Sequence, residues 1–141
     1  MIYSATQIAH YIVSKCIDDN CPITNLQLQN ILYYIQIEYL KNNELAFYDD
    51  IEAWQFGAVI PSVYYKYCGF GVMPITLKLE VNNIDSSDAN RFNTVINEKR
   101  KLFLWDISDE IYKNSGAWSQ TYKNGSGNKT VIPISLIREN C

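Results

Sequence analysis

The chain has 141 residues, of which 48% are hydrophobic and 19% charged, and its net charge is −3. This length fits a single domain spanning residues 1–141, and the composition excludes a wholly disordered chain. An acidic chain also lacks the clustered lysine and arginine surface that phosphate binding requires, which argues against a nucleic-acid partner. Eleven tyrosines are present, and tyrosine is favoured at protein interfaces.

Two capping boxes predict two helices in the first third of the chain. Ser4 stands three residues before Gln7, and Thr24 stands three residues before Gln27, so each pair can bond the backbone at a helix start. The second helix, predicted over residues 24–42, is apolar around most of its circumference. We therefore expect it to be a central helix that is covered on several sides.

A short β-hairpin is predicted over residues 44–57, with its turn at residues 49–50. Alternation along its second strand places Trp54 and Phe56 on one face. Gly57 is expected to end this strand. The sequence therefore predicts a mainly α fold of the α+β type, with a small hairpin packed against a compact helical domain.

A short helix is predicted to begin at Pro61, because proline suits the first turn of a helix. Helical spacing turns Val63, Tyr64 and Tyr67 inward, towards the rest of the domain. Tyr65 falls on a different face and is expected to point elsewhere. The neighbouring residues Tyr64 and Tyr65 are therefore predicted to lie in different environments.

Weaker patterns follow in the second half of the chain. Residues 75–81 alternate with period two and predict a short strand, and a serine at 86–87 opens a fourth helix. A further helix is predicted over residues 108–112. Residues 123–129 predict a flexible loop, and Pro133 begins a short terminal helix.

No catalytic or metal-binding motif stands out in the sequence. The one histidine, His10, falls on the polar face of the first helix, where we expect a solvated side chain. A small hydrolase that pairs His10 with Asp49 or Glu52 is the enzymatic alternative. The four cysteines show no CxxC spacing, so neither a metal nor another cofactor is expected.

The sequence also predicts a cytoplasmic protein. No apolar run approaches the roughly 18 residues of a membrane helix, and the N-terminus has no basic leader. The scattered cysteines are consistent with a reducing compartment. No membrane partner is expected.

Gln29 is the exceptional polar residue of the second helix, where it lies between Leu26 and Tyr33 at helical spacing. A buried amide is costly unless it is hydrogen-bonded. One interpretation is a strut that bonds the backbone of the hairpin or of the turn at Gly57, and the other is a partner contact. We assign structural roles to Gln29, Tyr33, Gly57 and Pro61.

Three segments, in this order, resemble the SocA-like antitoxin family, also called the Panacea antitoxin domain, which includes phage-associated GepA-like proteins. They read YSATQIAHYIVSK at residues 3–15, PITNLQLQNILYYIQ at residues 22–36 and IEAWQFGAVIPSVYYKY at residues 51–67. Most of the shared positions are core or turn types. Ala58 stands where the family has proline.

The resemblance implies a protein that neutralises a cognate toxin by direct binding. In adaptor-type members it implies delivery of the toxin to the chaperone subunit of an ATP-dependent protease. The fold by itself names no particular toxin. A phage-encoded inhibitor of a bacterial defence protein is the alternative.

The candidate partner-binding residues are Trp54, Gln55, Phe56, Tyr64 and Tyr65. We expect Trp54 and Phe56 to frame a shallow groove with Tyr64, and Tyr65 to stand at its rim. The competing interpretation is that Trp54, Phe56 and Tyr64 only join the hairpin to the helices.

Overall fold

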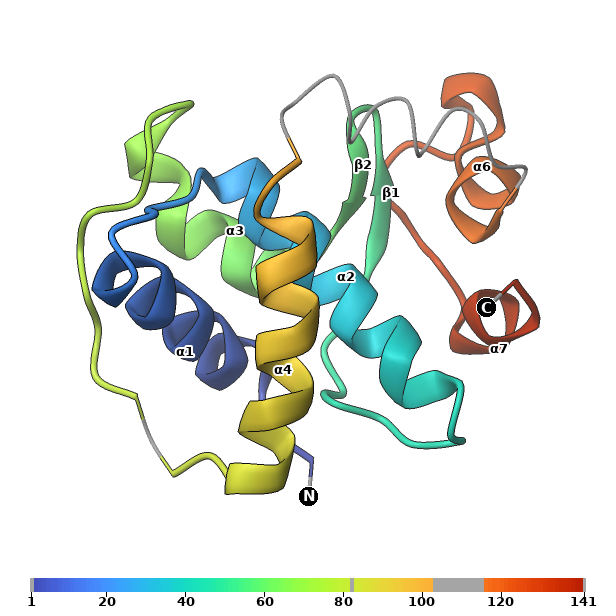
Figure 1. Ribbon diagram of the computed structural model, residues 1–141. Helices are drawn as coiled ribbons and strands as arrows, with labels where there is room; N and C mark the ends of the chain where they lie inside the picture. Colours follow the sequence, from blue (N-terminus) through green and yellow to red (C-terminus); the bar gives the residue numbers. More distant parts are fainter. Residues whose placement is uncertain (1, 82, 103–115, 141) are drawn as a thin grey trace.

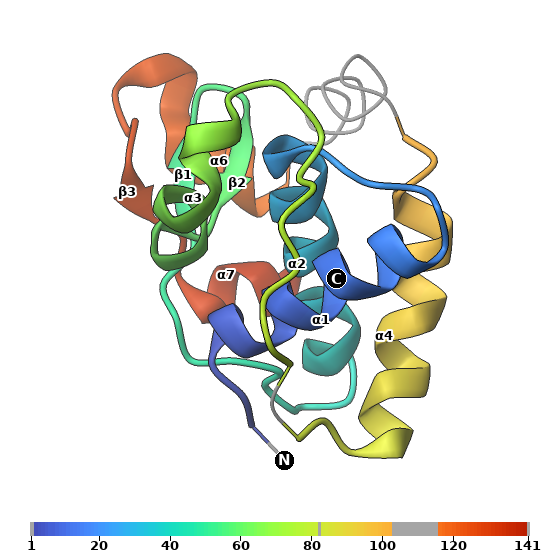
Figure 2. The ribbon, with the colours of Figure 1, turned by 90° about the vertical axis from the view of Figure 1, so that its left-hand side faces the viewer.

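The computed structural model describes residues 2–81, 83–102 and 116–140, and this part of the chain has a mainly α fold with a small antiparallel sheet (Figures 1 and 2). The predicted fold class is therefore confirmed. In chain order the elements are α1 (Ala5–Asp18), α2 (Asn25–Leu40), β1 (Glu52–Trp54), β2 (Gly57–Val59), α3 (Pro61–Tyr67), α4 (Ser86–Lys99), α6 (Ala117–Tyr122), β3 (Thr130–Val131) and α7 (Ile134–Glu139), with 3₁₀ turns at Cys68–Phe70 and Lys123–Gly125. The helix predicted over residues 108–112 lies outside the described residues.

Both predicted capping boxes form. The Ser4 hydroxyl accepts a hydrogen bond from the Gln7 backbone N–H at 3.2 Å, and the Gln7 side chain accepts one from Ser4 N–H at 2.9 Å. Thr24 and Gln27 make the same pair of bonds at 3.2 and 2.8 Å. Each helix begins at the residue after its cap, so these two starts are set by local chemistry.

Helix α2 is central, as predicted. It packs against α1, α3, α4, α7 and β2, and Figure 2 shows the hairpin, α3, α6 and β3 gathered on one side of the molecule with α4 on the other. One apolar stripe of α2 is fully buried: Leu28, Ile31, Leu32, Ile35 and Tyr39. The second stripe remains partly exposed at Leu26, Tyr33 and Ile37. Of these, Leu26 and Tyr33 line a pocket beside the hairpin turn.

The hairpin turns at Gln55–Phe56, so the predicted turn at residues 49–50 is wrong. Strand β1 pairs with β2 in the register Glu52↔Val59 and Trp54↔Gly57. Gly57 therefore begins the second strand instead of ending one, and its φ of +137° is a backbone conformation that favours glycine. A third strand, β3, pairs with the other edge of β1, and the sequence did not predict it.

Asp49 explains why the turn was misplaced. Its carboxylate accepts hydrogen bonds from the Ala5 backbone N–H at 2.9 Å and from the Ser62 hydroxyl at 2.7 Å. It therefore satisfies a donor in the first turn of α1 and ties the chain to α3. An aspartate in this role resembles a turn residue in the sequence, because both uses depend on the same short acceptor side chain.

The strand predicted over residues 75–81 is also wrong. The segment carries no strand assignment, although Ile75 is buried and its N–H bonds to the Ile23 carbonyl at 2.7 Å. Leu77, at the next apolar position of the pattern, is 54% exposed, so the apolar residues of this segment do not share one buried face. Helix α4 is capped by Asp85 rather than by the predicted serine, and α7 follows Pro133 as expected. No helix of the described residues is long and apolar enough to cross a membrane.

Buried phenols give a pH prediction. Burial raises the pKa of Tyr67 to about 12, and burial together with the hydrogen bond to Asp88 raises the pKa of Tyr39. An unfolded tyrosine ionises near pH 10, so the unfolded state loses these protons first and the folded state is destabilised as the pH rises above about 10. Urea denaturation at rising pH should show a smaller decline for Tyr67→Phe than for the wild type. Identical declines would contradict this assignment.

Candidate functional site

Four of the predicted site residues form a continuous aromatic cluster where the hairpin turn meets α3. We call Trp54, Phe56, Tyr64 and Tyr65 the aromatic cluster. The ring centroids of Trp54 and Tyr64 lie 4.9 Å apart, those of Trp54 and Phe56 5.9 Å apart, and those of Tyr64 and Tyr65 5.6 Å apart. Gln55 is exposed in the turn beside them. The structure therefore brings all five candidate residues to one region.

Burial is graded across the cluster. Trp54 is only 7% exposed, Phe56 and Tyr64 are half-buried, and Tyr65 is 59% exposed. The Trp54 indole N–H donates to a Glu52 carboxylate oxygen at 2.9 Å. The Trp54, Phe56 and Tyr64 rings contact one another, so they form a packed surface and not the walls of the predicted groove. Trp54 is the base of this surface, and Tyr65 is its exposed rim.

Gln29 fixes α3, and with it the two tyrosines of the cluster, to α2. Its side chain is fully buried. The carbonyl oxygen accepts from the Ile60 N–H at 2.9 Å, just before α3, and the amide group donates to the Asn25 side chain at 3.0 Å. Asn25 in turn donates to the Tyr64 carbonyl at 3.0 Å. A fully buried amide with these bonds is a strut between elements.

Two further residues of the site come from the C-terminal part of the chain and were missed. The Trp118 indole N–H donates to the Trp54 carbonyl at 2.8 Å. The Lys129 ammonium lies 4.9 Å from the centroid of the Trp54 ring. Trp118 also stacks on Tyr122 at 4.8 Å, and this i,i+4 aromatic pair is the signal that could have predicted a short helix here.

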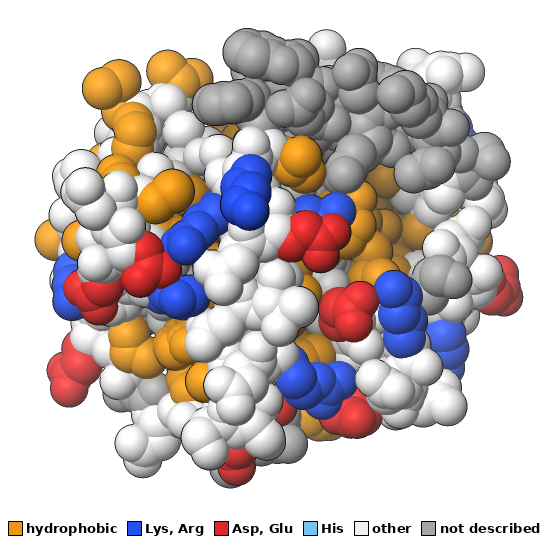
Figure 3. All heavy atoms as spheres, in the orientation of Figure 1, with side chains coloured by type: hydrophobic (Ala, Val, Ile, Leu, Met, Phe, Trp, Pro, Cys, Tyr) orange, Lys and Arg blue, Asp and Glu red, His pale blue; other side chains and the backbone are white. Residues whose placement is uncertain are grey.

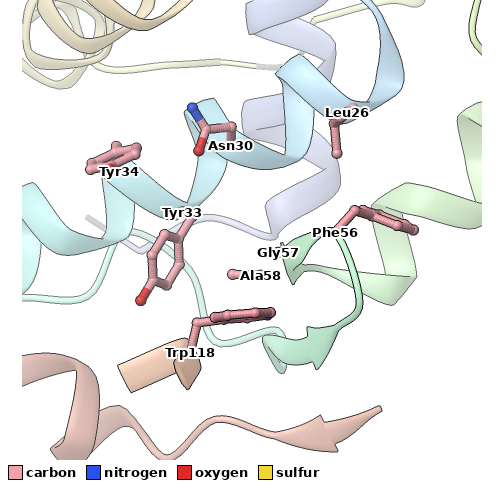
Figure 4. Close-up of a pocket in the computed structure, with 8 residues that line it drawn as sticks. All are labelled: Leu26, Asn30, Tyr33, Tyr34, Phe56, Gly57, Ala58 and Trp118. Carbon is pink, nitrogen blue, oxygen red and sulfur yellow. The ribbon is translucent and has the colours of Figure 1, made fainter. Parts of the chain in front are cut away.

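A shallow pocket lies between α2 and the hairpin turn (Figure 4). Tyr33 points into it from α2 and Trp118 from the opposite side, with Gly57 and Ala58 between them. Its volume of about 30 Å³ holds about one or two water molecules. Small-molecule sites usually measure roughly 300–1,000 Å³, so this pocket does not fit a small-molecule substrate.

His10 is not the solvated side chain that the sequence predicted. It is half-buried, and its ring meets the edge of the Tyr67 ring at a centroid distance of 6.4 Å. Burial lowers the pKa of His10, and its buried Nε2 atom has no hydrogen-bond partner. Helical spacing alone could not reveal this, because Tyr67 reaches His10 from a different helix.

The carboxylates proposed to work with His10 are engaged elsewhere. Asp49 accepts from Ala5 and Ser62, and Glu52 accepts from Trp54. Neither bonds the His10 Nε2 atom. The described structure therefore does not assemble the catalytic pair on which the hydrolase alternative depends. Within residues 2–81, 83–102 and 116–140, no group of three His, Cys, Asp or Glu side chains is placed to hold a metal ion.

Apolar side chains also gather beyond the aromatic cluster. Figure 3 shows hydrophobic atoms protruding at the upper left, where Figure 1 places the loop that follows α3. In this loop Val72 is 90% exposed and Met73 65% exposed. Apolar side chains are therefore exposed at Tyr65 and again in the loop that follows α3.

No protein-family model, curated protein or solved structure matches this chain. The resemblance to the SocA-like antitoxins therefore stays a prediction that depends on the three quoted segments.

Proposed function

We propose that this chain is a protein-binding module of the antitoxin type, which neutralises a toxin by direct binding through the rim of the aromatic cluster. The observation that carries the proposal is the graded burial of that cluster: a core tryptophan supports two half-buried rings and one exposed tyrosine. Tyrosine and tryptophan are the residues that most often dominate binding energy at interfaces.

The support beneath the cluster favours binding over a purely structural role for Tyr65. The buried bonds from Gln29 and Asn25 hold the backbone at Ile60 and Tyr64, so the helix that carries Tyr65 is fixed before any partner arrives. A pre-organised aromatic side chain loses little conformational entropy on binding. Tyr65 itself buries too little of its surface to be needed for the core.

The resemblance supports the same region. Its second and third segments, residues 22–36 and 51–67, are joined in the structure by the bonds of Gln29 and Asn25 to the backbone of the third segment. The aromatic cluster belongs to that third segment. The shared pattern therefore includes Trp54 and Tyr64 of the cluster together with Gln29 and Asn25, which hold α3 in place.

Tyr65→Ala tests this proposal. We expect the variant to bind the toxin encoded by the adjacent gene about 30-fold more weakly, because a buried aromatic anchor contributes about 2 kcal/mol or more. Cells that express this toxin should lose protection. The melting temperature should hardly change, because Tyr65 is largely exposed.

The matched control is Tyr48→Ala. Tyr48 is 73% exposed and lies in the loop between α2 and β1. The substitution Tyr48→Ala therefore removes a similar side chain from a different surface. It should keep full affinity and full protection. Equal protection by the Tyr65 and Tyr48 variants would reject the aromatic cluster as the binding surface.

A further inference from the structure

A backbone hydrogen bond holds Lys129 next to Trp54, the base of the aromatic cluster. The Lys129 N–H donates to the Ala53 carbonyl at 2.7 Å, next to Trp54 in β1. The preceding turn is also tight, since a Cβ atom on Gly127 would stand 1.8 Å from the Thr121 carbonyl oxygen. Residues 123–129 therefore form a hydrogen-bonded turn and not the flexible loop that the sequence predicted. The turn delivers the Lys129 side chain to the Trp54 ring.

Lys129 occupies a backbone conformation that glycine adopts more easily. Its φ is +65°, and the Cβ atom of an L-residue is strained in this left-handed region. The other described non-glycine residues with positive φ are three asparagines, which tolerate this region, and Lys123. Backbone strain of this kind recurs at functional sites. Glycine would suit the backbone at position 129 better than lysine, so the reason for a lysine here must lie in its side chain.

Among the described residues, Lys129 forms no ion pair. The ion pairs among the described residues involve other lysines and arginines. Glu52, which is on the neighbouring strand, bonds to the Trp54 indole N–H. An exposed ammonium above an aromatic ring is thus left to face solvent in a chain whose net charge is −3.

We propose that Lys129 recognises a carboxylate of the protein partner, and that the bound segment of the partner places an Asp or Glu beside an apolar side chain that packs on Tyr65. This inference depends on the proposed function and names the chemistry of its partner. A carboxylate that reaches Lys129 in the interface forms a charge-assisted hydrogen bond. The adjacent rings exclude water, which strengthens the attraction relative to an exposed pair.

The variant Lys129→Gly separates binding from folding. It removes the ammonium and relieves the left-handed strain, so the melting temperature should stay the same or rise. Lys123→Gly is the matched control, because Lys123 has a φ of +50° and is exposed in the same turn, whereas the ammonium above Trp54 belongs to Lys129.

A displayed library of random peptides, selected on the wild-type protein, supplies the probe. Peptides whose binding requires Tyr65 should be enriched in an Asp or Glu next to a large apolar residue. Lys129→Gly should weaken them about fivefold at physiological salt, the upper range for a partly exposed ion pair. Lys129→Glu should shift the enrichment to Lys and Arg, and Lys123→Gly should bind as the wild type does.

Each outcome is decisive. Peptides that require Tyr65 but bind Lys129→Gly at full strength would overturn the role of Lys129 and leave the proposed function standing. Tyr65-dependent peptides that show no enrichment of Asp or Glu would also overturn the role of Lys129 and leave the proposed function standing. A selection that yields no Tyr65-dependent peptide would count against this inference, while protection from the toxin in cells would still test the proposed function separately.

Discussion

Replacing Trp54 with alanine should lower the free energy of unfolding by about 3–5 kcal/mol, the usual cost of deleting a large core side chain. Trp54 is 7% exposed and contacts the rings of Phe56, Tyr64 and Tyr65. The substitution leaves a cavity at the centre of the aromatic cluster and removes the indole donor to Glu52. Chemical denaturation of the purified variant measures the loss.

Tyr65→Ala is the matched comparison for Trp54→Ala, because both remove a ring from the same cluster. Tyr65 is 59% exposed, so Tyr65→Ala should lower the free energy of unfolding by no more than about 1 kcal/mol. A Tyr65 variant as unstable as the Trp54 variant would show that Tyr65 serves the core. The division of the cluster into a buried base and an exposed rim would then be wrong.

Gln29→Met should lower the free energy of unfolding by about 3 kcal/mol. In this buried site the substitution leaves the Ile60 N–H without an acceptor and the Asn25 side chain without its donor. Methionine keeps nearly the same shape, so the loss reports hydrogen bonding more than packing. The damage should be local. Hydrogen exchange at the first turn of α3 should accelerate in this variant.

Gln36→Met is the control for Gln29→Met. Gln36 is equally buried on α2, but it bonds the backbone of Ala46 and Phe47 in the loop before the hairpin. It should cause a similar loss of stability and leave exchange at the first turn of α3 unchanged once global unfolding is accounted for. Accelerated exchange at α3 in both variants would deny Gln29 a specific role in holding that helix.

The elements that the sequence predicted well are those set by neighbouring residues. The Ser4 and Thr24 caps bond side chains only three residues away, and Pro61 begins α3 because its fixed φ suits a first turn. The hairpin turn was misplaced because Asp49 bonds Ala5, 44 residues earlier in the chain. No local pattern reveals a bond between segments so far apart.

In the candidate site, too, the contacts between residues close in sequence were predicted and those between distant segments were not. Trp54, Phe56, Tyr64 and Tyr65 lie within twelve residues of the sequence, and their convergence was predicted from that short stretch. Phe56 nevertheless meets Trp54 through a tight turn and not through strand alternation. Lys129 comes from a turn rich in glycine and asparagine, which has no hydrophobic period. Its place over Trp54 depends on the pairing of β3 with β1.

The most direct test of the binding surface is hydrogen exchange on the chain alone and in complex with the protein encoded by the adjacent gene. Binding at the rim should slow amide exchange at the hairpin turn, residues 55–57, and in α3, while α4 and α7 exchange as they do in the free chain. Slowed exchange confined to α4 or α7, with the hairpin turn and α3 unchanged, would contradict the account.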